Sequence, residues 1–264
     1  MSIVIRPSSL PQFADCQRRS AARMFAIQIK EAGYTLREIA SSVGASVGTA
    51  THTAVASCMT TKMNTGELGN QTEDEQRGVE SLEQQIGYGV SWDPTTPNLS
   101  TGQRQVVRMY RSYRGTVAER VQPRAVERRL ESRTRRGNIL SGQPDLVDDG
   151  IRDQKTGVMH RVSLQQLGAY SLLVRAAGGE VLSLTEDYIQ RVDIEKEQPE
   201  PVEFRYDVGL AERVAANTIA DVEERYAKFV ETGDNLVFRA NPSSQLCSAK
   251  WCPCHSSTFC REHA

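Results

Sequence analysis

Two aspartates and a lysine lie on either side of a turn signal: Asp145, Asp153 and Lys155. Residues 148–150 read Asp-Asp-Gly, and glycine supplies the positive φ that tight hairpin turns need. A three-residue loop there would place Asp145 opposite Asp153 across two strands, with their Cβ atoms about 5 Å apart. A divalent cation would relieve the repulsion, because hard cations bind carboxylate oxygens. Strand alternation returns Lys155 to the same face, which is an arrangement suited to phosphodiester cleavage.

Two alternatives to this hairpin stay open at the level of sequence. A two-residue loop, Asp149-Gly150, would shift the register and separate the two acids. The same stretch also fits a solvated hairpin whose outer residues are simply charged. The proposed chemistry therefore depends on a turn at residues 148–150.

The composition sets broad limits on function. The chain has 264 residues and a net charge of −1, which is enough length to bury a core and too little positive charge to coat nucleic acid. A local basic groove is still compatible with this balance. No apolar run approaches the roughly 20 residues of a membrane helix, and the first residues lack a secretory pattern. We therefore expect a cytoplasmic protein. It has no Gly-x4-Gly-Lys-Ser/Thr phosphate loop.

Periodicity and turn signals indicate helices first, then a sheet interrupted by one helix. The predicted helices are residues 8–32, 35–42, 46–63, 71–87, 100–120, 162–177 and 209–231. The predicted strands are residues 125–133, the hairpin 140–155, and segments near 180–192 and 202–206. Residues from Leu236 onward show little regular pattern. This order is typical of an α/β or α+β domain.

Arginines are concentrated in two segments. One predicted helix carries four of them at spacings of four, three and three: Arg104, Arg108, Arg111 and Arg114. Six more lie between Arg124 and Arg136. These residues could follow a phosphate backbone or form a solvated helix face. The candidate DNA-binding residues are Arg104, Arg108, Arg111, Arg128 and Arg135.

Six cysteines suggest a metal site near the chain ends. They are Cys16, Cys58, Cys247, Cys252, Cys254 and Cys260. In a reducing compartment a cysteine cluster is more often a metal site than a set of disulfides. A tetrahedral zinc site made by the four tail cysteines, with His255 as a further ligand, is one alternative.

Together these residues resemble the RecB-type branch of the PD-(D/E)xK nuclease superfamily. Pro144-Asp145 stands for the first acidic motif and Asp153-Gln154-Lys155 for the second. Gln166 and Tyr170 match the Gln-x3-Tyr of the following helix, and His52 matches the upstream helical histidine. Glu127 lies where the family often has an acid, and Glu131 competes with it by strand alternation.

The resemblance implies a restriction-endonuclease-like core, with a mixed central sheet flanked by helices. It implies one nuclease domain over residues 1–264, with Mg²⁺ or Mn²⁺ held by His52, Asp145, Asp153 and the backbone carbonyl of Gln154. Lys155 would orient the attacking water, and Gln166 and Tyr170 would complete the catalytic group. The expected parts are an N-terminal helix (1–34), a helical subdomain carrying His52 (35–120), a catalytic sheet core (121–232) and a cysteine-rich tail (233–264).

A subset of this branch, which includes the CRISPR-associated exonucleases, holds a 4Fe–4S cluster. One cysteine near the N-terminus and three near the C-terminus hold it. Here the resemblance implies Cys16, Cys247, Cys252 and Cys260 as ligands. The tail departs from the commonest C-x2-C-x5-C spacing, because Cys252 and Cys254 are separated by one residue. Cys254 would then be spare, and Cys58 a buried free thiol.

The resulting hypothesis is a metal-dependent DNA nuclease, an exonuclease acting on single strands or DNA ends. The resemblance implies DNA as partner, with separate helicase, recombination or CRISPR proteins; recombination, repair and CRISPR adaptation stay open, as does a homo-oligomer. We expect no membrane partner. One alternative is a non-catalytic DNA-binding or assembly module with cysteine-bound zinc or iron–sulphur. Another is a sequence-specific endonuclease of the same superfamily.

Overall fold

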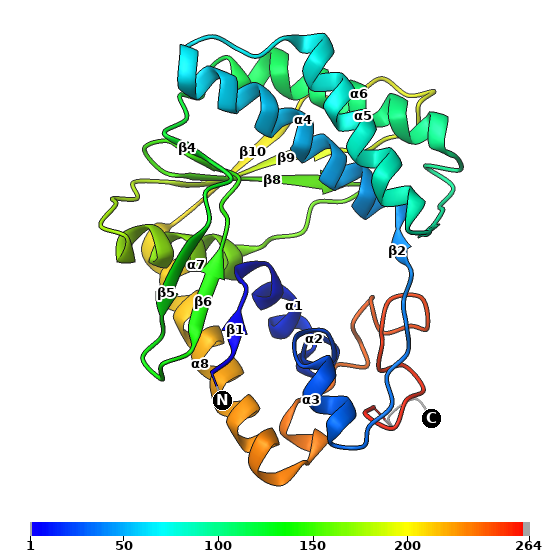
Figure 1. Ribbon diagram of the computed structural model, residues 1–264, viewed down its shortest axis with the longest axis vertical. Coiled ribbons are helices and arrows are strands. Elements are labelled where there is room, and N and C mark those ends of the chain that lie inside the picture. Colours follow the sequence, from blue (N-terminus) through cyan, green and yellow to red (C-terminus); the bar gives the residue numbers. More distant parts are fainter. Residues whose placement is uncertain (1, 261–264) are drawn as a thin grey trace.

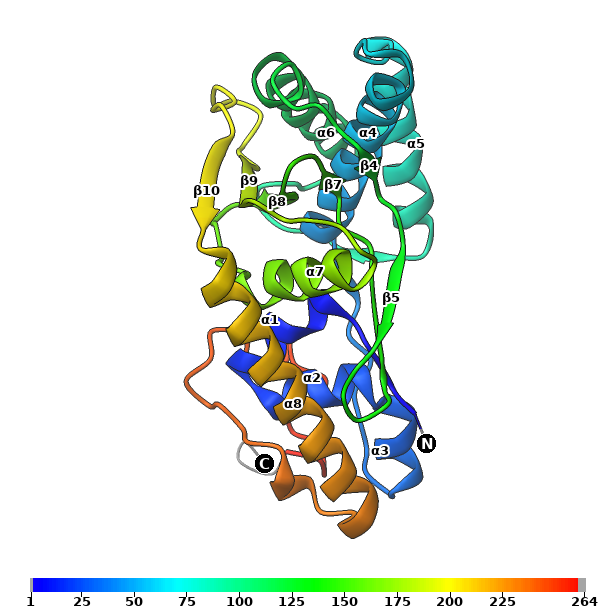
Figure 2. The same cartoon turned by 90° about the vertical axis from the view of Figure 1, so that its left-hand side faces the viewer.

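The computed structural model describes residues 2–260, in which helices cover both faces of a mixed sheet (Figures 1 and 2). Helices α4, α5 and α6 lie on one side of this sheet, and α7 and α8 lie on the other (Figure 1). The prediction of a mixed sheet flanked by helices is confirmed. Among the described residues, no helix is both long enough and apolar enough to cross a membrane.

The central sheet has five strands, with one parallel pair in an otherwise antiparallel order. The order is β10 (Val202–Tyr206), β9 (Leu184–Gln190), β8 (Ile151–Gly157), β7 (Leu146–Val147) and β4 (Ala125–Val126). Strands β8 and β9 are parallel, and the other pairs are antiparallel. Strand β8 is therefore central and has partners on both sides, which fixes the residues it carries.

A second sheet continues from the first. It consists of β1 (Val4–Ile5), β6 (Ile139–Gly142) and β5 (Leu130–Arg133). The strand predicted at 125–133 is divided between the two sheets, because Glu127 takes a left-handed φ of 45° that ends β4. A third, two-stranded sheet pairs β2 (Ser41–Ser42) with β3 (Val90–Ser91).

The N-terminal helix predicted over residues 8–32 is three helices. After a 3-10 turn, η1 (Pro7–Ser9), come α1 (Leu10–Asp15), α2 (Gln17–Met24) and α3 (Ala26–Glu31). Cys16 is extended, with φ −147° and ψ 104°, so it separates the first two helices. The helix predicted at 35–42 is wrong: this segment is extended, because Arg37 N–H donates to the distant Pro253 carbonyl and Ser41 pairs with Val90.

The helical subdomain follows the prediction closely. It contains α4 (Val43–Thr65), α5 (Gln71–Gly87) and α6 (Leu99–Tyr113), with a π-helical turn, η2 (Arg114–Ala118), after α6. Ser42, Asn70 and Asn98 cap the three helices by accepting hydrogen bonds from backbone amides of the first turn. These helices bury their own apolar cluster, which includes Val47, Ala54 and Leu82, against Leu146 and Ile189 of the sheet.

The hairpin at residues 148–150 has the predicted register. Leu146 pairs with Arg152 and Val147 with Ile151, so the loop has three residues. Gly150 has no positive φ, however, so the conformational reason given for it is wrong. A Cβ at Gly150 would overlap the backbone of Ser183, which approaches closely on the neighbouring chain. Glycine is therefore required at position 150 because there is no room for a side chain.

Helices α7 (Leu164–Ala176) and α8 (Val208–Thr232) pack together under the sheet, and the chain then passes through η3 (Asn235–Val237) into the tail. A Cβ at Gly168 of α7 would overlap the Ala211 carbonyl of α8. Residues 261–264 of the predicted tail lie outside the described residues.

We predict that Gly168→Ala destabilises the fold by about 1–3 kcal/mol, because overpacking against backbone outweighs the roughly 1 kcal/mol by which alanine favours a helix. Gly87→Ala is the matched control, since a Cβ there meets nothing within 4 Å. Urea unfolding of both variants measures the difference. A Gly168→Ala variant as stable as the Gly87→Ala variant would contradict this packing.

Candidate active site

The two predicted acids meet at the end of the β7–β8 hairpin. Asp145 directly precedes β7, and Asp153 lies in β8, where only 1% of its surface is exposed. The pairing of Leu146 with Arg152 makes Asp145 and Asp153 the next pair in register. The Asp145 carboxylate accepts a hydrogen bond of 2.7 Å from the Gln154 backbone N–H. The hairpin therefore holds both carboxylates at one place.

Lys155 and the helix α7 complete this group. Lys155 Nζ forms an ion pair with Asp153 and donates a hydrogen bond of 2.9 Å to Gln166 Oε1. Gln166 Nε2 lies 3.0 Å from Asp153 Oδ1 and 3.2 Å from the Tyr170 hydroxyl. The predicted shared face of Gln166 and Tyr170 thus meets β8. Tyr170 also packs on Gly142, where a Cβ would come within 2.9 Å of its ring.

His52 reaches the site from the other side of the sheet. Its Nδ1 lies 3.5 Å from Asp145 Oδ2. Helix α4 comes this close because it passes β8 at Gly48, where a Cβ would overlap the Thr156 hydroxyl. The structure thus brings together all the residues that the sequence assigned to catalysis and to the divalent ion.

Burial and neighbouring charges shift the pKa values of this group. Burial raises the pKa of the Asp153 carboxyl to about 6; Lys155 opposes the rise and the charge of Asp145 adds to it. Burial alone would raise the pKa of Asp145, but His52, Lys155 and the Gln154 amide hold it below its usual range. Burial alone would lower the pKa of His52, and Asp145 raises it instead. One carboxylate is thus readily ionised and the other resists ionisation.

Glu127, rather than Glu131, is the further acid near this group. Its pKa is raised by loss of water contact and by the charge of Asp145, and its backbone N–H donates to the Asp145 carbonyl at 3.0 Å. Glu131 lies in the other sheet, where its carboxylate accepts a hydrogen bond from Ser141. The positive φ of Glu127 is a strained conformation for a non-glycine residue, and here it turns the chain beside the acids.

The carboxylate donors of this group suit a hard divalent ion. In this structure, however, the Lys155 ammonium occupies the position beside Asp153 that such an ion would need. Among residues 2–260, no three His, Cys, Asp or Glu side chains are placed so that they could hold a metal ion. Asp153 Oδ2 is buried and is paired with the Lys155 ammonium. A divalent ion would therefore compete with Lys155 for this carboxylate.

The predicted DNA-binding arginines are dispersed. Arg108 donates to the Ile194 carbonyl at 2.9 Å, and Arg111 pairs with Glu75 at 2.7 Å. Arg114, on the same predicted stripe, contacts the Cys58 thiol. The remaining three are exposed: Arg104, Arg128 and Arg135. The β5–β6 hairpin extends away from β8 and bonds to Glu223 of α8 through Asn138 (Figure 1). The assignment of these arginines to DNA stays a prediction.

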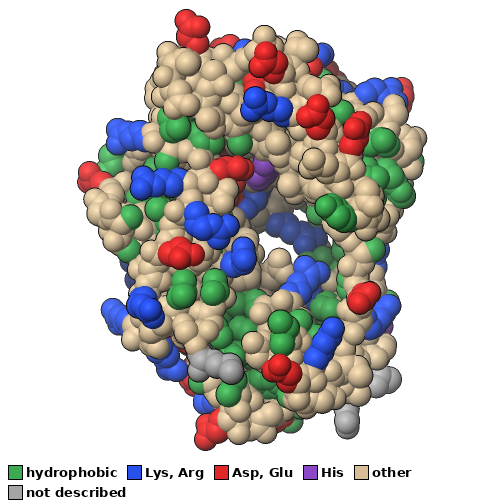
Figure 3. All heavy atoms as spheres, in the orientation of Figure 1, with side chains coloured by type: hydrophobic (Ala, Val, Ile, Leu, Met, Phe, Trp, Pro, Cys, Tyr) green, Lys and Arg blue, Asp and Glu red, His purple; other side chains and the backbone are tan. Residues whose placement is uncertain are grey.

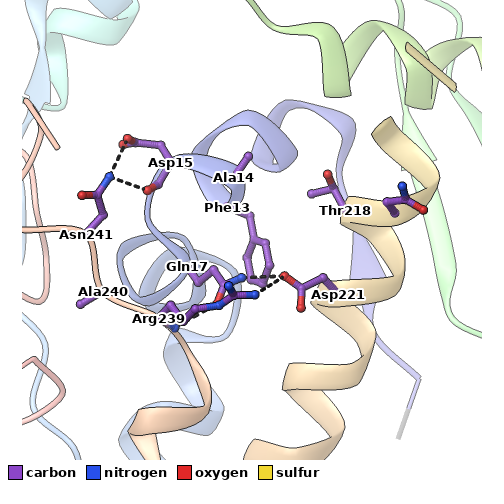
Figure 4. Close-up of a pocket in the computed structure, with 10 residues that line it drawn as sticks. Phe13, Ala14, Asp15, Gln17, Thr218, Asp221, Arg239, Ala240 and Asn241 are labelled. Atoms are coloured by element: carbon purple, nitrogen blue, oxygen red, sulfur yellow. Dashed lines mark hydrogen bonds and ion pairs between the residues drawn. The ribbon is translucent and has the colours of Figure 1, made fainter. Parts of the chain in front are cut away.

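The tail returns to the N-terminal helices beside Cys16. The backbone of Arg239 bonds to Gln17 and Arg18, and Asn241 Nδ2 donates to the Asp15 carbonyl at 3.0 Å. Figure 4 shows this docking, with residues 239–241 lying across from α8 at a pocket of about 380 Å³. Arg239 reaches Asp221 of α8 there. The two ends of the chain are thus joined around Cys16.

Five of the six cysteines share this neighbourhood. Cys16, Cys252, Cys254 and Cys260 are buried, and burial together with the neighbouring groups of Cys252, Cys16 and Cys260 raises the pKa of Cys247. A hydrogen bond from the Cys254 thiol lowers the pKa of Cys252 to about 6, and the Cys254 thiol also contacts the Arg18 carbonyl. Cys58 lies apart, in the apolar cluster of the helical subdomain. The sulfurs are close together but, within the described part of the chain, do not surround a common metal position.

Comparison with known proteins shows the family of this chain. The family model of the PD-(D/E)XK nuclease superfamily matches residues 5–261. The chain belongs to this superfamily. Among solved structures, one similar protein is from Eubacterium rectale and is described as a "putative exonuclease". It shares a TM-score of 0.56 and 12% identity, over 92% of this chain and 86% of that chain. At this identity the likeness shows the fold. No curated protein matches.

Membership in the PD-(D/E)XK nuclease superfamily supports a hydrolytic nuclease. The assignment of Pro144-Asp145 and Asp153-Gln154-Lys155 as the two halves of the motif stays a prediction. The comparisons do not distinguish the iron–sulphur branch or a likeness to CRISPR-associated exonucleases, so both stay predictions.

One buried acid next to Asp153 is not among the residues predicted from the sequence. Glu186 of β9 is the register partner of Asp153 and is completely buried. Its carboxylate accepts hydrogen bonds from the Ser163 N–H at 3.0 Å and the Tyr206 hydroxyl at 2.7 Å, and contacts His160. Ser163 is the N-cap residue of α7, so this carboxylate holds the helix that carries Gln166. Two adjacent acids between the apolar residues Leu184 and Ile189 of this strand were the available signal.

We predict that Glu186→Gln lowers the free energy of unfolding by about 1–3 kcal/mol, because an amide cannot replace charge-assisted bonds to several donors at once. Asp149→Asn, an exposed change on the β7–β8 turn, should leave it unchanged. Urea unfolding monitored by circular dichroism provides the measurement. An unshifted midpoint for Glu186→Gln would show that this carboxylate does not hold α7.

Proposed function

We propose that this protein is a metal-dependent deoxyribonuclease, an exonuclease that acts on single-stranded DNA or on DNA ends. The observation that carries the proposal is the group of Asp145, Asp153, Lys155 and Gln166, linked by hydrogen bonds and an ion pair. The superfamily supports phosphodiester hydrolysis, and the name of the Eubacterium rectale protein favours an exonuclease. Recombination, repair and CRISPR adaptation are all compatible pathways.

The roles of the side chains follow from their positions. Asp145 and Asp153 would hold Mg²⁺ or Mn²⁺, with the Gln154 carbonyl and His52 as further donors. The metal, when bound, would supply a water of lowered pKa and neutralise the phosphate. Lys155 would release Asp153 and place its ammonium beside the attacked phosphate, where negative charge develops. Gln166 would keep Lys155 oriented through its 2.9 Å hydrogen bond, and Tyr170 would hold Gln166.

Asp153→Asn tests the catalytic assignment. Losing one metal-holding carboxylate should lower the rate of hydrolysis at least about a hundredfold, because several kcal/mol of transition-state stabilisation disappear. Binding of labelled single-stranded DNA should survive, since asparagine keeps an acceptor for Gln166. Release of labelled nucleotides with Mg²⁺ or Mn²⁺ measures the rate.

Asp149→Asn is the control for this experiment, because it removes a carboxylate from the exposed tip of the same hairpin. It should hydrolyse DNA at the rate of the unaltered protein. Unchanged cleavage by the Asp153→Asn variant would contradict the assignment of Asp153 to the active site. If the unaltered protein binds DNA without cleaving it under any divalent ion, the alternative of a non-catalytic DNA-binding module holds.

We also propose that the tail cysteines hold an iron–sulphur cluster, with Cys16, Cys247, Cys252 and Cys260 as ligands. The gathering of cysteines from both chain ends supports this proposal. The cluster would have a structural role, since it would link residues near both ends of the sequence and close nearly the whole chain into one loop. Cys254 is a further candidate, because it is buried and its thiol bonds to Cys252.

Anaerobic purification should then give a brown protein with iron and acid-labile sulfide. Cys16→Ala should lose the colour and destabilise the fold, whereas Cys58→Ala should keep the colour because Cys58 lies in the other apolar cluster. Metal analysis and visible absorbance measure both. A colourless protein that contains stoichiometric zinc would show that the cysteines hold zinc and not an iron–sulphur cluster.

A further inference from the structure

Two cavities meet at Lys155. One, of about 720 Å³, lies between α1, α2, the N-terminal end of α7 and residues 37–42. The other, of about 650 Å³, lies between the ends of β8 and α4 and the tail. Lys155, Arg161, Leu246 and Trp251 line both. Figure 3 shows an opening in the centre of the molecule, with Lys and Arg side chains around it. The catalytic lysine therefore faces a continuous internal space.

The charge of this space differs from that of the whole protein. The chain carries a net charge of −1, whereas the unpaired charges on the cavity walls are almost all positive. One acid lines the two cavities, Asp93, and it is neutralised by Arg191 at 2.8 Å. Two of the basic wall residues are also paired, Arg19 with Asp15 and Lys155 with Asp153. The remaining charged wall residues are Arg23, Arg37, Arg161 and Lys250. Such a field concentrates a polyanion inside the molecule.

Trp251 stands where the two cavities join. Its ring is half-buried, with Lys250 Nζ 4.8 Å from the ring centroid, and Arg23 donates to its carbonyl at 3.0 Å. An aromatic ring among basic side chains is the arrangement on which unpaired bases stack while cations follow the phosphates. A base pair in a duplex does not expose its faces in this way. The wall chemistry therefore favours a single strand.

A strap, residues 33–42, closes this space on its outer side. It has no helix and joins α3 to α4 (Figure 1). Thr35 and Thr258 exchange backbone-to-hydroxyl hydrogen bonds of 2.8 and 3.2 Å, and Arg37 N–H donates to the Pro253 carbonyl at 2.9 Å. The pairing of β2 with β3 fixes its other end. The strap and tail thus form a closed wall opposite the active site.

We propose that the two cavities form a passage through which one DNA strand is threaded, free end first, with its bases on Trp251 and its phosphates on Arg37, Arg161 and Lys250. The strap and tail close the passage, so a strand without an end cannot enter sideways. This inference rests on the proposed function for the identity of the polyanion. It explains end-dependence by the shape of the protein, without recognition of the terminal nucleotide.

Binding without divalent metal separates this passage from catalysis. In EDTA, a labelled linear oligonucleotide should bind, while the circle ligated from it should bind at least about tenfold more weakly, a difference of roughly 1.4 kcal/mol. Streptavidin on biotin at both ends of the linear strand should make it behave like the circle. Fluorescence anisotropy provides the measurement. Equal affinity for linear and circular strands, or tighter binding of a blunt duplex, would overturn the passage.

Substitutions on the wall locate the strand. Arg37→Ala and Arg161→Ala should each lower the slope of log affinity against log salt by about 0.7, because each removes one phosphate contact. Lys30→Ala, an exposed lysine of α3 that lines neither cavity, should leave the slope unchanged. Trp251→Leu should weaken binding about tenfold, and Trp251→Phe should restore most of it, because stacking needs an aromatic ring. A slope unaffected by both arginine changes would refute this path.

The two proposals can fail separately. If linear strands are preferred in EDTA but are not cut when Mg²⁺ or Mn²⁺ is added, the passage stands and the nuclease assignment falls. If circles and end-blocked strands are cut as fast as free linear strands, the nuclease assignment stands and the passage falls.

Discussion

The buried contact between Asp153 and Lys155 is the interaction around which the rest of the molecule is arranged. A carboxylate with 1% exposure is costly unless it is paired and hydrogen-bonded, because removing a charge from water carries a penalty of several kcal/mol. Lys155 and Gln166 provide the compensation. Each compensating residue needs its own support: β8 must be held on both edges, and α7 must be held at its N-terminus. The charge pair of Asp153 and Lys155 thus depends on both the sheet and helix α7.

Neighbouring acids on β8 and β9 show why burial alone does not identify a catalytic group. Asp153 and Glu186 are register partners, and both are almost inaccessible to water. Glu186 has both oxygens occupied by fixed donors, so it stabilises the start of α7. Asp153 has one oxygen paired with the Lys155 ammonium, for which a divalent ion would compete. The difference in chemistry comes from the partners of each carboxylate.

Local features of the sequence were sufficient to predict which residues meet at the candidate active site. Contacts between segments far apart in the sequence could not be predicted. The turn at 148–150 determined the register of Asp145 and Asp153, and a four-residue spacing placed Gln166 and Tyr170 on one helix face. The extended strap was missed because its hydrogen bonds go to distant parts of the chain, to β3 and to Pro253 and Thr258 of the tail. Its own sequence has nothing that forbids a helix. The wall arginines were missed for the same reason, since they come from separate elements and share no local pattern.

The cysteine-rich tail has a position that connects the two chemical regions of the protein. Between Leu246 and Thr258 the chain supplies three cysteines of the cysteine neighbourhood, the aromatic side chain of the cavity wall and the anchor of the strap. These residues lie outside regular helices and strands, and their local backbone hydrogen bonds close only short turns. Contacts with the N-terminal helices must therefore hold the segment in place. Whatever binds the cysteines consequently also sets the wall opposite Lys155, because both are parts of one short stretch of chain.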